Sequence, residues 1–383
     1  MNILVLNYEY PPLGGGAASV CRNLTEETAK AGHRVTVVTT GFRGLPDYEK
    51  TPDGVEIYRL DCGRKKQYAS TPREQVAYIL RAKSFLRGHL KQNAYDVCHA
   101  HFVIPTGPAA LWAKKRFGLP YVLTAHGSDV EGYNRKAWIR AAHVFLRPFW
   151  RRIVRESHAA AAPSRWLMEL MERRVHGARL VLLPNGLRPE KFRTEPGEKK
   201  NRILLMGRMQ AAKNMQTVLA AVSLIPEEIW GDWHADLLGD GPYRSELERL
   251  AEELKITDRV SFRGWVENGS PEQLEYMRRA SVCISASLFE NCPMSVLETI
   301  AAGCSPLLSD IEGHRQLFGE DAESFFFPAD DARKLASMLA ERILEKRTEP
   351  LPVPDIRQYG IREVTDKYLA LLAGAAKTRR IRK

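Results

Sequence analysis

The sequence lacks any apolar run of about eighteen residues, the length at which a helix begins to span a bilayer. Its first residues, Met1–Asn7, contain neither a basic region nor a cleavage site, which argues against a signal peptide. The six cysteines form no C-x-x-C pair, and several lie within apolar runs, so we expect reduced core thiols rather than disulfides or zinc. These absences predict a cytoplasmic protein.

Acidic residues are scarce in the first half of the chain. Residues 1–187 hold 28 Lys and Arg against 15 Asp and Glu, which gives a net charge of +13. Residues 188–383 have a net charge of −2, and the whole chain has a net charge of +11. Segment 135–155 contains seven Lys or Arg and no acid, with large apolar residues between them, and residues 377–383 add five cations. This pattern favours reversible contact with an anionic membrane on its inner face, although a core helix with a solvated basic face also fits 135–155. Nucleic acid is not an expected partner, since the second half is not basic.

The length of 383 residues, 44% of them apolar, exceeds one ordinary α/β core and suits two domains. Apolar β runs alternate with stretches of helical spacing, which predicts parallel sheets covered on both faces. In the first half the predicted strands are Ile3–Asn7, Arg34–Thr39, Val55–Leu60, Val97–Ala100, Tyr121–Ala125, His158–Ala162 and Leu180–Leu183. In the second half they are Arg202–Met206, Ala235–Leu238, Val260–Arg263, Val282–Ser285, Ser305–Leu308 and Ser324–Phe327.

The two series are separated by a polar stretch. Residues 184–186 (Pro-Asn-Gly) end the first series, and residues 188–201 contain two prolines and a glycine, as expected of a linker. A helix predicted over Asp355–Ala376 closes the chain. We therefore expect an N-terminal domain over 1–187, completed by a helix within 358–383, and a C-terminal domain over 188–357.

Two carboxylates stand eight positions apart after the predicted strand Val282–Ser285. Glu290 lies on a loop and Glu298 lies one to two turns inside the following helix, with Pro293 at the expected first helical turn. A loop and a helix placed in this way can hold one ligand at two points. A strand-loop-helix unit also presents backbone N–H groups to an anion.

Arg208 and Lys213 share the loop that follows the first strand of the second domain. An Arg offers a planar fork to two phosphate oxygens and a Lys offers a point charge, so the pair can neutralise a diphosphate leaving group. Two solvated loop cations are the alternative interpretation.

Three glycines, Gly14 to Gly16, follow the first strand and precede a helix predicted from Ser19 to Ala31. Without Cβ atoms, the backbone of Gly15 and Gly16 can approach a phosphate, although a purely structural turn also fits. A dinucleotide-binding loop is disfavoured, because the spacing is not G-x-G-x-x-G and no acid ends the second strand.

In the second domain, Gly239-Asp240-Gly241 ends a strand and Arg263-Gly264-Trp265-Val266 ends the next. Arg263, Gly264 and Val266 offer main-chain donors and acceptors for the edge of a base. Asp240 is either a turn-forming residue or a ligand.

His126 and Asp129 follow a first-domain strand, at the sheet edge where ligands gather in α/β folds. His126 faces a ligand or is structural. His99 and His101 have i, i+2 spacing, but no third ligand is nearby, so lining of the cleft is favoured over zinc.

Taken together, these elements resemble the retaining GT-B glycosyltransferases, in particular the family 4 type (glycosyl transferases group 1). The resemblance implies an α/β protein with two Rossmann-like domains that face each other across a deep cleft. It implies that Glu290 and His126 face the donor sugar, that Glu298 holds the ribose, and that His101 and Asp129 lie on the acceptor side. The remaining implied donor-binding residues are Gly15, Gly16, Arg208, Lys213, Arg263, Gly264, Val266, Cys292, Pro293, Met294 and Ser295. The family's commoner E-G-F-G opening is changed, with Asn291 and Cys292 after Glu290.

The implied activity is metal-independent transfer of a hexosyl unit, with retention, to a glycan or lipid-linked acceptor in cell-envelope or polysaccharide synthesis. A UDP-hexose is expected as donor ahead of GDP-mannose, with no cofactor besides this donor substrate. Arg208 and Lys213 supply the positive charge, and no D-x-D is placed on a suitable loop. An epimerase or phosphorylase on the same fold, or a non-catalytic membrane-associated binding protein, are the alternatives.

Overall fold

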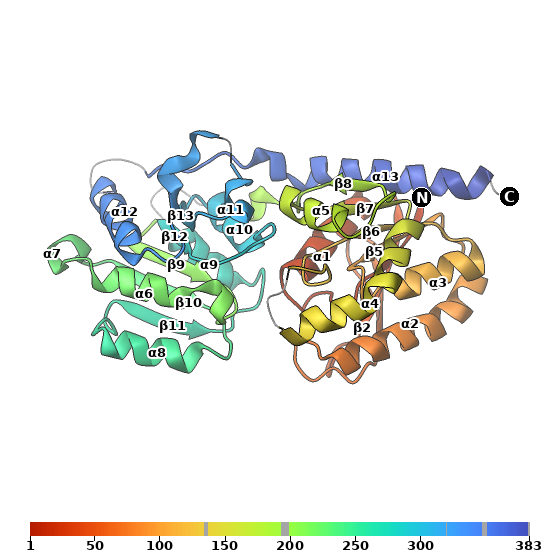
Figure 1. Cartoon of the computed structure of the whole chain (residues 1–383), viewed down its shortest axis with the longest axis horizontal. Coiled ribbons are helices and arrows are strands. Elements are labelled where there is room, and N and C mark those ends of the chain that lie inside the picture. Colours follow the sequence, from red (N-terminus) through yellow and green to blue (C-terminus); the bar gives the residue numbers. More distant parts are fainter. Residues whose placement is uncertain (134–136, 193–198, 319, 347–350, 382–383) are drawn as a thin grey trace. The chain divides into compact units, whose positions relative to one another are not determined.

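The computed structural model describes residues 1–133, 137–192, 199–318, 320–346 and 351–381. The chain divides into two compact units (Figure 1). Unit 1 comprises Met1–Gly186 with Tyr359–Lys383, and unit 2 comprises Leu187–Gln358. These limits differ by one residue from the expected ones. Of the expected linker, residues 193–198 lie outside the described residues, and Pro189–Phe192 forms a 3-10 helix, η1.

Unit 1 contains an eight-stranded sheet in the order β3-β4-β2-β1-β5-β6-β7-β8. All neighbouring strands are parallel except β3 and β4. A parallel sheet is buried on both faces, which is why most of its strands are continuous apolar runs. The strands are β1 (Asn2–Leu6), β2 (Arg34–Thr40), β3 (Tyr48–Lys50), β4 (Glu56–Leu60), β5 (Val97–His101), β6 (Tyr121–Thr124), β7 (Ala159–Ala162) and β8 (Leu180–Leu182).

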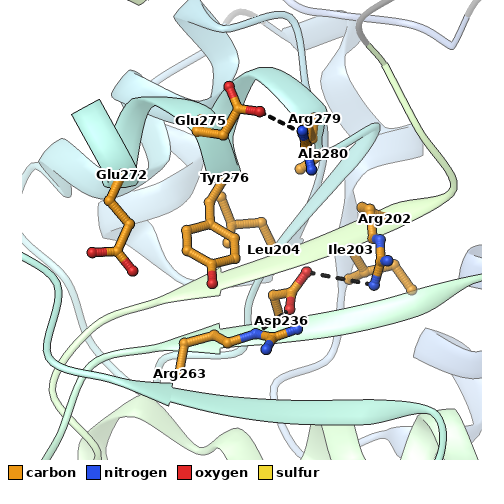
Figure 2. A pocket seen from close by; sticks show the side chains of 10 residues that line it. All are labelled: Arg202, Ile203, Leu204, Asp236, Arg263, Glu272, Glu275, Tyr276, Arg279 and Ala280. Atoms are coloured by element: carbon orange, nitrogen blue, oxygen red, sulfur yellow. Dashed lines mark hydrogen bonds and ion pairs between the residues drawn. The ribbon is translucent and has the colours of Figure 1, made fainter. Parts of the chain in front are cut away.

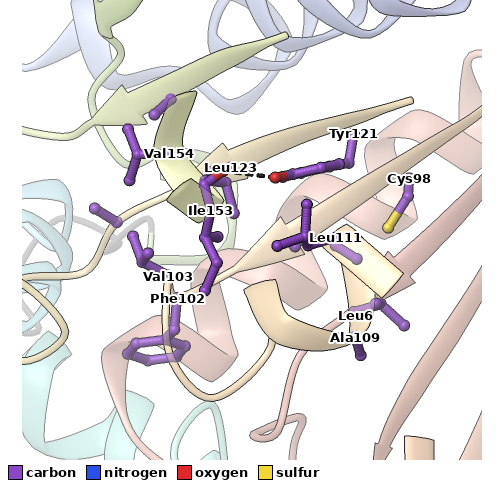
Figure 3. Packing of buried hydrophobic residues seen from close by; sticks show 14 of the residues in the cluster. Leu6, Cys98, Phe102, Val103, Ala109, Leu111, Tyr121, Leu123, Ile153 and Val154 are labelled. Carbon is purple, nitrogen blue, oxygen red and sulfur yellow. Dashed lines mark hydrogen bonds between the residues drawn. The ribbon is translucent and has the colours of Figure 1, made fainter. Parts of the chain in front are cut away.

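Four helices pack with this sheet into one apolar core, part of which is shown in Figure 3. They are α2 (Pro72–Gln92), α3 (Gly107–Phe117), α4 (Ala137–Glu156) and α5 (Arg165–Glu172). Thr71 and Glu74 form a capping box that fixes the start of α2. Helix α4 is fixed by the buried side chain of Ile153, whose carbonyl accepts a 2.5 Å hydrogen bond from Tyr121 Oη.

The last helix of the chain returns to unit 1. Helix α13 (Ile361–Ile381) packs against α1 (Gly16–Lys30), β5 and β6. Its Tyr368 Oη accepts a 3.2 Å hydrogen bond from Thr124 Oγ1, and Arg379 donates to the carbonyl of Tyr95. Unit 1 is therefore completed by residues from both ends of the described chain.

Unit 2 contains a six-stranded sheet in the order β11-β10-β9-β12-β13-β14, and all its pairs are parallel. The strands are β9 (Arg202–Met206), β10 (His234–Leu238), β11 (Val260–Gly264), β12 (Val282–Ser285), β13 (Ser305–Ser309) and β14 (Phe326–Phe327). The helices are α6 (Met215–Ser223), α7 (Glu227–Trp230), α8 (Arg244–Glu253), α9 (Pro271–Arg279), α10 (Met294–Ala301), α11 (Glu312–Arg315) and α12 (Ala332–Glu345). Because β9 lies between β10 and β12, the strand order reverses there, and such switch points form ligand sites at the carboxyl ends of strands.

Two doubly wound, mainly parallel α/β domains were predicted, and the structure confirms them. Three details were wrong. The antiparallel strand β3 was missed, because it is a short polar segment held by its hairpin with β4. The last strand is only β14, since Glu320–Phe325 forms a 3-10 helix, η3. The closing helix begins at Ile361 rather than Asp355, because residues 357–359 form a separate 3-10 turn, η4, before Gly360.

The two faces of α4 differ sharply in burial, which predicts different mutational costs. Ile153→Ala should lower the free energy of unfolding by about 2–5 kcal/mol, because it leaves a cavity beneath the helix. Val144→Ala, on the same helix but 52% exposed, should change it by less than about 0.5 kcal/mol. Urea unfolding followed by circular dichroism measures both, and equal costs would contradict the described orientation of α4.

Candidate functional site

The loop after β9 presents Lys213 at the switch point of unit 2. It ends in a short 3-10 turn, η2 (Ala211–Lys213), and Asn214 then takes the left-handed conformation with φ +50° before α6. The Lys213 side chain lies along Gly207, where an added Cβ would stand 3.2 Å from Lys213 Cε. Arg208 is exposed on the same loop. Arg208 and Lys213, which the sequence placed on one loop, therefore both lie on the loop after β9.

The loop after β10 packs backbone against backbone on the loop after β9. A Cβ at Gly239, where φ is +132°, would lie 2.0 Å from the carbonyl oxygen of Gly207, so only glycine fits. A Cβ at Gly241 would lie 2.2 Å from the oxygen of Met209. Asp240 Oδ1 accepts the N–H of Gly241 at 2.7 Å, and this supports its turn-forming interpretation.

Glu290, on the loop after β12, forms an ion pair with Lys213. Its Oε1 also accepts a 2.8 Å hydrogen bond from Ser287 Oγ. The backbone joins the same two loops, because Leu288 N donates to the carbonyl of Ala212 at 2.9 Å. The structure therefore brings together two of the residues that the sequence singled out, although they are 77 positions apart along the chain.

The charge of Glu290 depends on its partners. Burial by itself raises the pKa of this carboxyl, but Lys213, followed by His314 and the hydrogen bond from Ser287, outweighs burial and lowers the pKa below its usual value. Glu290 is therefore ionised near neutral pH. Lys213 has three donor hydrogens, so it can hold Glu290 and still donate to a second acceptor.

A short helix that sequence reasoning missed supports the Glu290 loop from behind. Gly313 of α11 abuts this loop, since a Cβ there would lie 2.1 Å from the Glu290 carbonyl oxygen. The side chain of Gln316 donates to the carbonyl of Asn291. His314 is fully buried, with Nδ1 2.9 Å from the Ser309 carbonyl and Nε2 3.3 Å from Ser285 Oγ, and burial lowers its pKa to about 4. The sequence analysis singled out no residue of this segment.

The segment from Cys292 to Glu298 leads from the loop into α10. Pro293 is the residue before the helix, which begins at Met294 and not at the expected Pro293. Cys292 and Met294 are buried, whereas Ser295 and Glu298 are half-buried. Glu298 lies in the second turn of α10, as predicted.

Arg263, at the end of β11, points its side chain into a pocket of about 280 Å³ between the sheet and α9 (Figure 2). Its Nε donates to Asp236 Oδ1 at 2.7 Å, and Arg202 lies 3.9 Å from the same carboxylate. The Arg263 side chain is thus engaged by Asp236. The expected contact of a base with the main chain of Arg263, Gly264 and Val266 stays a prediction, and one of its acceptors, the Gly264 carbonyl, is already bonded to Gly239 N at 2.7 Å.

In unit 1, Gly15 and Gly16 stand at the start of α1. Gly15 is the residue before the helix, so α1 begins three positions earlier than predicted. Gly14, with φ +91°, donates its N–H to the Gln67 carbonyl at 2.8 Å, and a Cβ there would meet the Glu9 side chain. Gly14 therefore has a structural role, while Gly15 and Gly16 are partly or fully exposed.

Three histidines, called the histidine stack below, are in ring contact: His99 and His101 belong to β5, and His126 follows β6. The ring of His101 lies 4.3 Å from that of His99 and 5.3 Å from that of His126, between centroids. His101 Nδ1 is 3.1 Å from His126 Nε2, and His99 Nε2 is 2.8 Å from Thr124 Oγ1. Burial lowers the pKa of His99 and of His126 to about 3 and that of His101 well below its usual value, so all three are neutral near neutral pH.

His101 and Asp129 are buried, and both contact the His126 residue or its loop. His101 is completely buried, which corrects the expectation that it lines a cleft on the acceptor side. Asp129 accepts the N–H groups of Val103 at 2.6 Å and His126 at 2.9 Å, so it orients the His126 loop. Burial, opposed by these hydrogen bonds, raises the Asp129 pKa to about 6.

Among the residues that the structure describes, no three His, Cys, Asp or Glu side chains are grouped to hold a metal ion. The three histidines of the stack do not form such a group either. No helix in the described ranges has the length and apolar character needed to cross a membrane. Residues 135–136 and 382–383 of the two expected basic segments lie outside the described residues. The six cysteines are free and buried, as expected.

Comparison with known families gives two matches that together span most of the chain. One model, described as a glycosyl transferase 4-like domain, matches residues 15–186, and another, described as glycosyl transferases group 1, matches residues 188–351.

Individual proteins are similar to this chain at sequence identities of 15–26%. An alpha-monoglucosyldiacylglycerol synthase of Streptococcus pneumoniae is 26% identical over 325 residues, which are 79% of this chain and 70% of that protein. The UDP-Gal:alpha-D-GlcNAc-diphosphoundecaprenol alpha-1,3-galactosyltransferase of Escherichia coli is 25% identical over 289 residues, 71% of this chain and 73% of that protein. HepE of Anabaena, solved with UDP-glucose, shares the fold with a TM-score of 0.66, at 15% identity and 99% coverage of both chains.

The dependence of Glu290 on Lys213 yields a prediction with a defined pH profile. Lys213→Met removes the cation but leaves the burial, so the Glu290 pKa should rise above its usual value, and the variant should lose about 2 kcal/mol of stability near neutral pH. The parent loses the stabilisation from this pair as pH falls through the lowered pKa, while protonation relieves the unpaired carboxylate in the variant. The stability gap should therefore narrow toward acid pH.

Urea unfolding at neutral and mildly acidic pH measures this gap. The double variant Lys213→Met with Glu290→Gln serves as control and should show little pH dependence of the gap, because no buried carboxylate remains. A gap for Lys213→Met that stays constant with pH would contradict the coupling.

Proposed function

Because this chain belongs to the group 1 glycosyltransferases of the GT-B fold, we propose that it moves a hexosyl unit from a nucleotide sugar to a glycan or lipid-linked acceptor with retention of anomeric configuration. The observation that carries this proposal is the joining of the Lys213 loop to the Glu290 loop at the switch point of unit 2. A cation and a carboxylate are held there on loops that follow adjacent strands, β9 and β12.

In the proposed mechanism, Arg208 and Lys213 stabilise the negative charge that develops on the departing diphosphate. Glu298 holds the ribose, and Glu290 with His126 holds the sugar. The acceptor oxygen attacks the anomeric carbon on the face that the leaving group vacates, and no residue is assigned as a covalent nucleophile. The neutral imidazole of His126 suits contact with sugar hydroxyls, because it can form hydrogen bonds without placing a positive charge beside the sugar.

Metal independence is part of the proposal. Two cations on one loop can perform the charge neutralisation that a divalent ion supplies elsewhere. Arg208 is exposed, and the Lys213 side chain is 22% exposed, so both remain accessible to a diphosphate.

The donor and acceptor classes rest on the similar proteins. HepE binds UDP-glucose, and the E. coli relative is named for a UDP-galactose donor, which supports a UDP-hexose. The two curated relatives are named for a diacylglycerol product and a diphosphoundecaprenol acceptor, which supports a lipid-linked acceptor in cell-envelope synthesis. We propose a cytoplasmic protein that works at the inner face of the membrane.

The proposal is tested by nucleotide release from UDP-, GDP- and ADP-sugars in the presence of EDTA. Lys213→Ala should weaken UDP binding and abolish release. Glu290→Gln should abolish release yet bind UDP more tightly by a factor of several, because the Lys213 charge is no longer neutralised. Arg249→Ala, a surface cation on α8 of the same unit, should leave both quantities unchanged.

The outcomes separate the candidate activities. Release from one donor that persists in EDTA and is lost in both site variants supports the transferase. A donor that is consumed without nucleotide release would instead indicate an epimerase, and donor binding without any turnover, with lipid extracts supplied as acceptors, would indicate a binding protein.

The histidine stack predicts that His101 is a positioning residue for His126. His101→Phe removes the 3.1 Å contact to His126 Nε2 and should lower kcat about fivefold, the equivalent of one neutral hydrogen bond, with unchanged affinity for UDP. His101→Asn keeps a polar atom near Nδ1 and should restore most of the rate. Equal rates for the Phe and Asn variants would refute the role.

A further inference from the structure

Unit 2 contains a pocket apart from the loops of the candidate donor site. It is the pocket of about 280 Å³ between the sheet and α9 (Figure 2). Arg202 begins β9 and Ala280 precedes β12, so the pocket reaches the amino-terminal ends of these strands. Lys213 and Glu290 instead follow the carboxyl ends of the same two strands. Arg263 belongs to both places, because its side chain lines the pocket and its main chain is the expected contact of the base.

Three polar groups of this pocket keep free hydrogen-bonding capacity. The Asp236 side chain is only 7% exposed, and its Oδ1 accepts a hydrogen bond from Arg263 Nε. Its Oδ2 lies 3.9 Å from Arg202, which is beyond hydrogen-bonding distance. Within the part of the chain that the structure describes, the Glu272 carboxylate and the Tyr276 hydroxyl have no hydrogen-bond partner. A largely buried carboxylate oxygen beside two such groups marks a place where a polar ligand can bind.

Tyr276 gives the pocket an aromatic wall. Its side chain extends from α9 toward the strands, with the hydroxyl foremost (Figure 2). The guanidinium carbon of Arg263 lies 5.9 Å from the ring centroid, within the range of a cation–π contact. Ile203 and Leu204 are buried and add apolar surface to the lining. The pocket therefore combines apolar surface with hydrogen-bond donors and acceptors.

The charges that line the pocket balance. The lining includes three arginines and three carboxylates, at positions 202, 263, 279, 236, 272 and 275. A phosphate ligand would meet the carboxylates and a cationic ligand would meet the arginines, so neither kind of ion is favoured. A neutral ligand with several hydroxyl groups can accept from the arginines and donate to the carboxylates at the same time.

A pyranose ring matches this chemistry. Its C–H faces are apolar and can pack on an aromatic ring, while its hydroxyls both donate and accept. Ligand pockets measure roughly 300–1,000 Å³ for drug-sized molecules, so this smaller volume suits one sugar ring rather than a complete nucleotide sugar. We propose that the pocket is a second carbohydrate site, which binds one hexopyranosyl unit of a neutral glycan between Tyr276 and Asp236.

A glycan held in this pocket would remain on the enzyme between transfers. When a molecule binds at two points, the second binding step is intramolecular, which raises the effective concentration at the second point. For a glycan acceptor long enough to reach the donor site, the pocket adds affinity without touching the reacting atoms. This consequence rests on the proposed function, whereas the binding of a sugar in the pocket does not.

The test titrates the purified full chain, in the presence of saturating UDP, with the methyl α-glycosides of glucose, galactose, mannose and N-acetylglucosamine. Binding of each sugar is followed by saturation-transfer difference NMR, and at least one glycoside should bind. Tyr276→Ala should weaken this binding about tenfold, and Glu272→Gln should weaken it about threefold. Glu252→Gln, which changes an exposed acid on α8 of the same unit, is the matched control and should bind like the parent.

Each other outcome overturns the inference. Absence of binding by all four glycosides would remove the sugar as ligand, and equal binding by Tyr276→Ala and the parent would place the sugar elsewhere. Binding that appears only when UDP is left out would place the sugar in the donor site. Displacement of the glycoside by inorganic phosphate would indicate an anion site instead.

Two further measurements separate this inference from the proposed function and from folding. Tyr276→Ala should leave nucleotide release unchanged, because the pocket lies away from Lys213 and Glu290. A parent that binds the glycoside but releases no nucleotide from any donor would count against the proposed function alone. The unfolding temperature of each variant reports on the fold, and Glu272→Gln, at an exposed position of α9, tests the pocket even if Tyr276→Ala fails to fold.

Discussion

The ion pair between Lys213 and Glu290 is the interaction on which the candidate site depends. A carboxylate in this position is unfavourable on burial alone, and the lysine makes the charged form the stable one. The pair also joins loops that follow different strands. One interaction therefore determines both the charge state of Glu290 and the relative position of the two loops. Around it, the glycines at 239 and 241 let backbones pack where a Cβ would collide with a carbonyl oxygen, and α11 lies behind the Glu290 loop.

The candidate site residues of the two units differ in charge. The site in unit 2 is built from ionised side chains and suits phosphate. The histidine stack in unit 1 is neutral, because burial makes a charged imidazole unfavourable there. Asp129 satisfies backbone N–H groups rather than a charged partner. Of the three histidines only His126 is partly exposed, and its neutral ring is better suited to hydroxyl groups than to anions.

Much of this could be predicted from the sequence, because strands in a buried parallel sheet are apolar runs and functional loops follow their carboxyl ends. That logic located the loops of Arg208, His126 and Glu290. It failed where long-range contacts decide the outcome. Nothing in the local sequence shows that His101 is buried against His126 or that the Arg263 side chain binds Asp236. Nor does it show that His314 supports the Glu290 loop. The basic, apolar character of α4 was visible, but the packing of Trp150 and Ile153 was needed to tell which face is outward.

The return of α13 to unit 1 has a consequence for how the protein is made. The helix packs on β5, β6 and α1, yet it is translated after the whole of unit 2. On the ribosome, unit 1 must wait with that face of its sheet uncovered while about 170 further residues emerge and fold. Unit 2 is one contiguous stretch and can finish first. The N-terminal unit is therefore expected to reach its native state last, and the nascent chain to need protection of its β5–β6 surface until then.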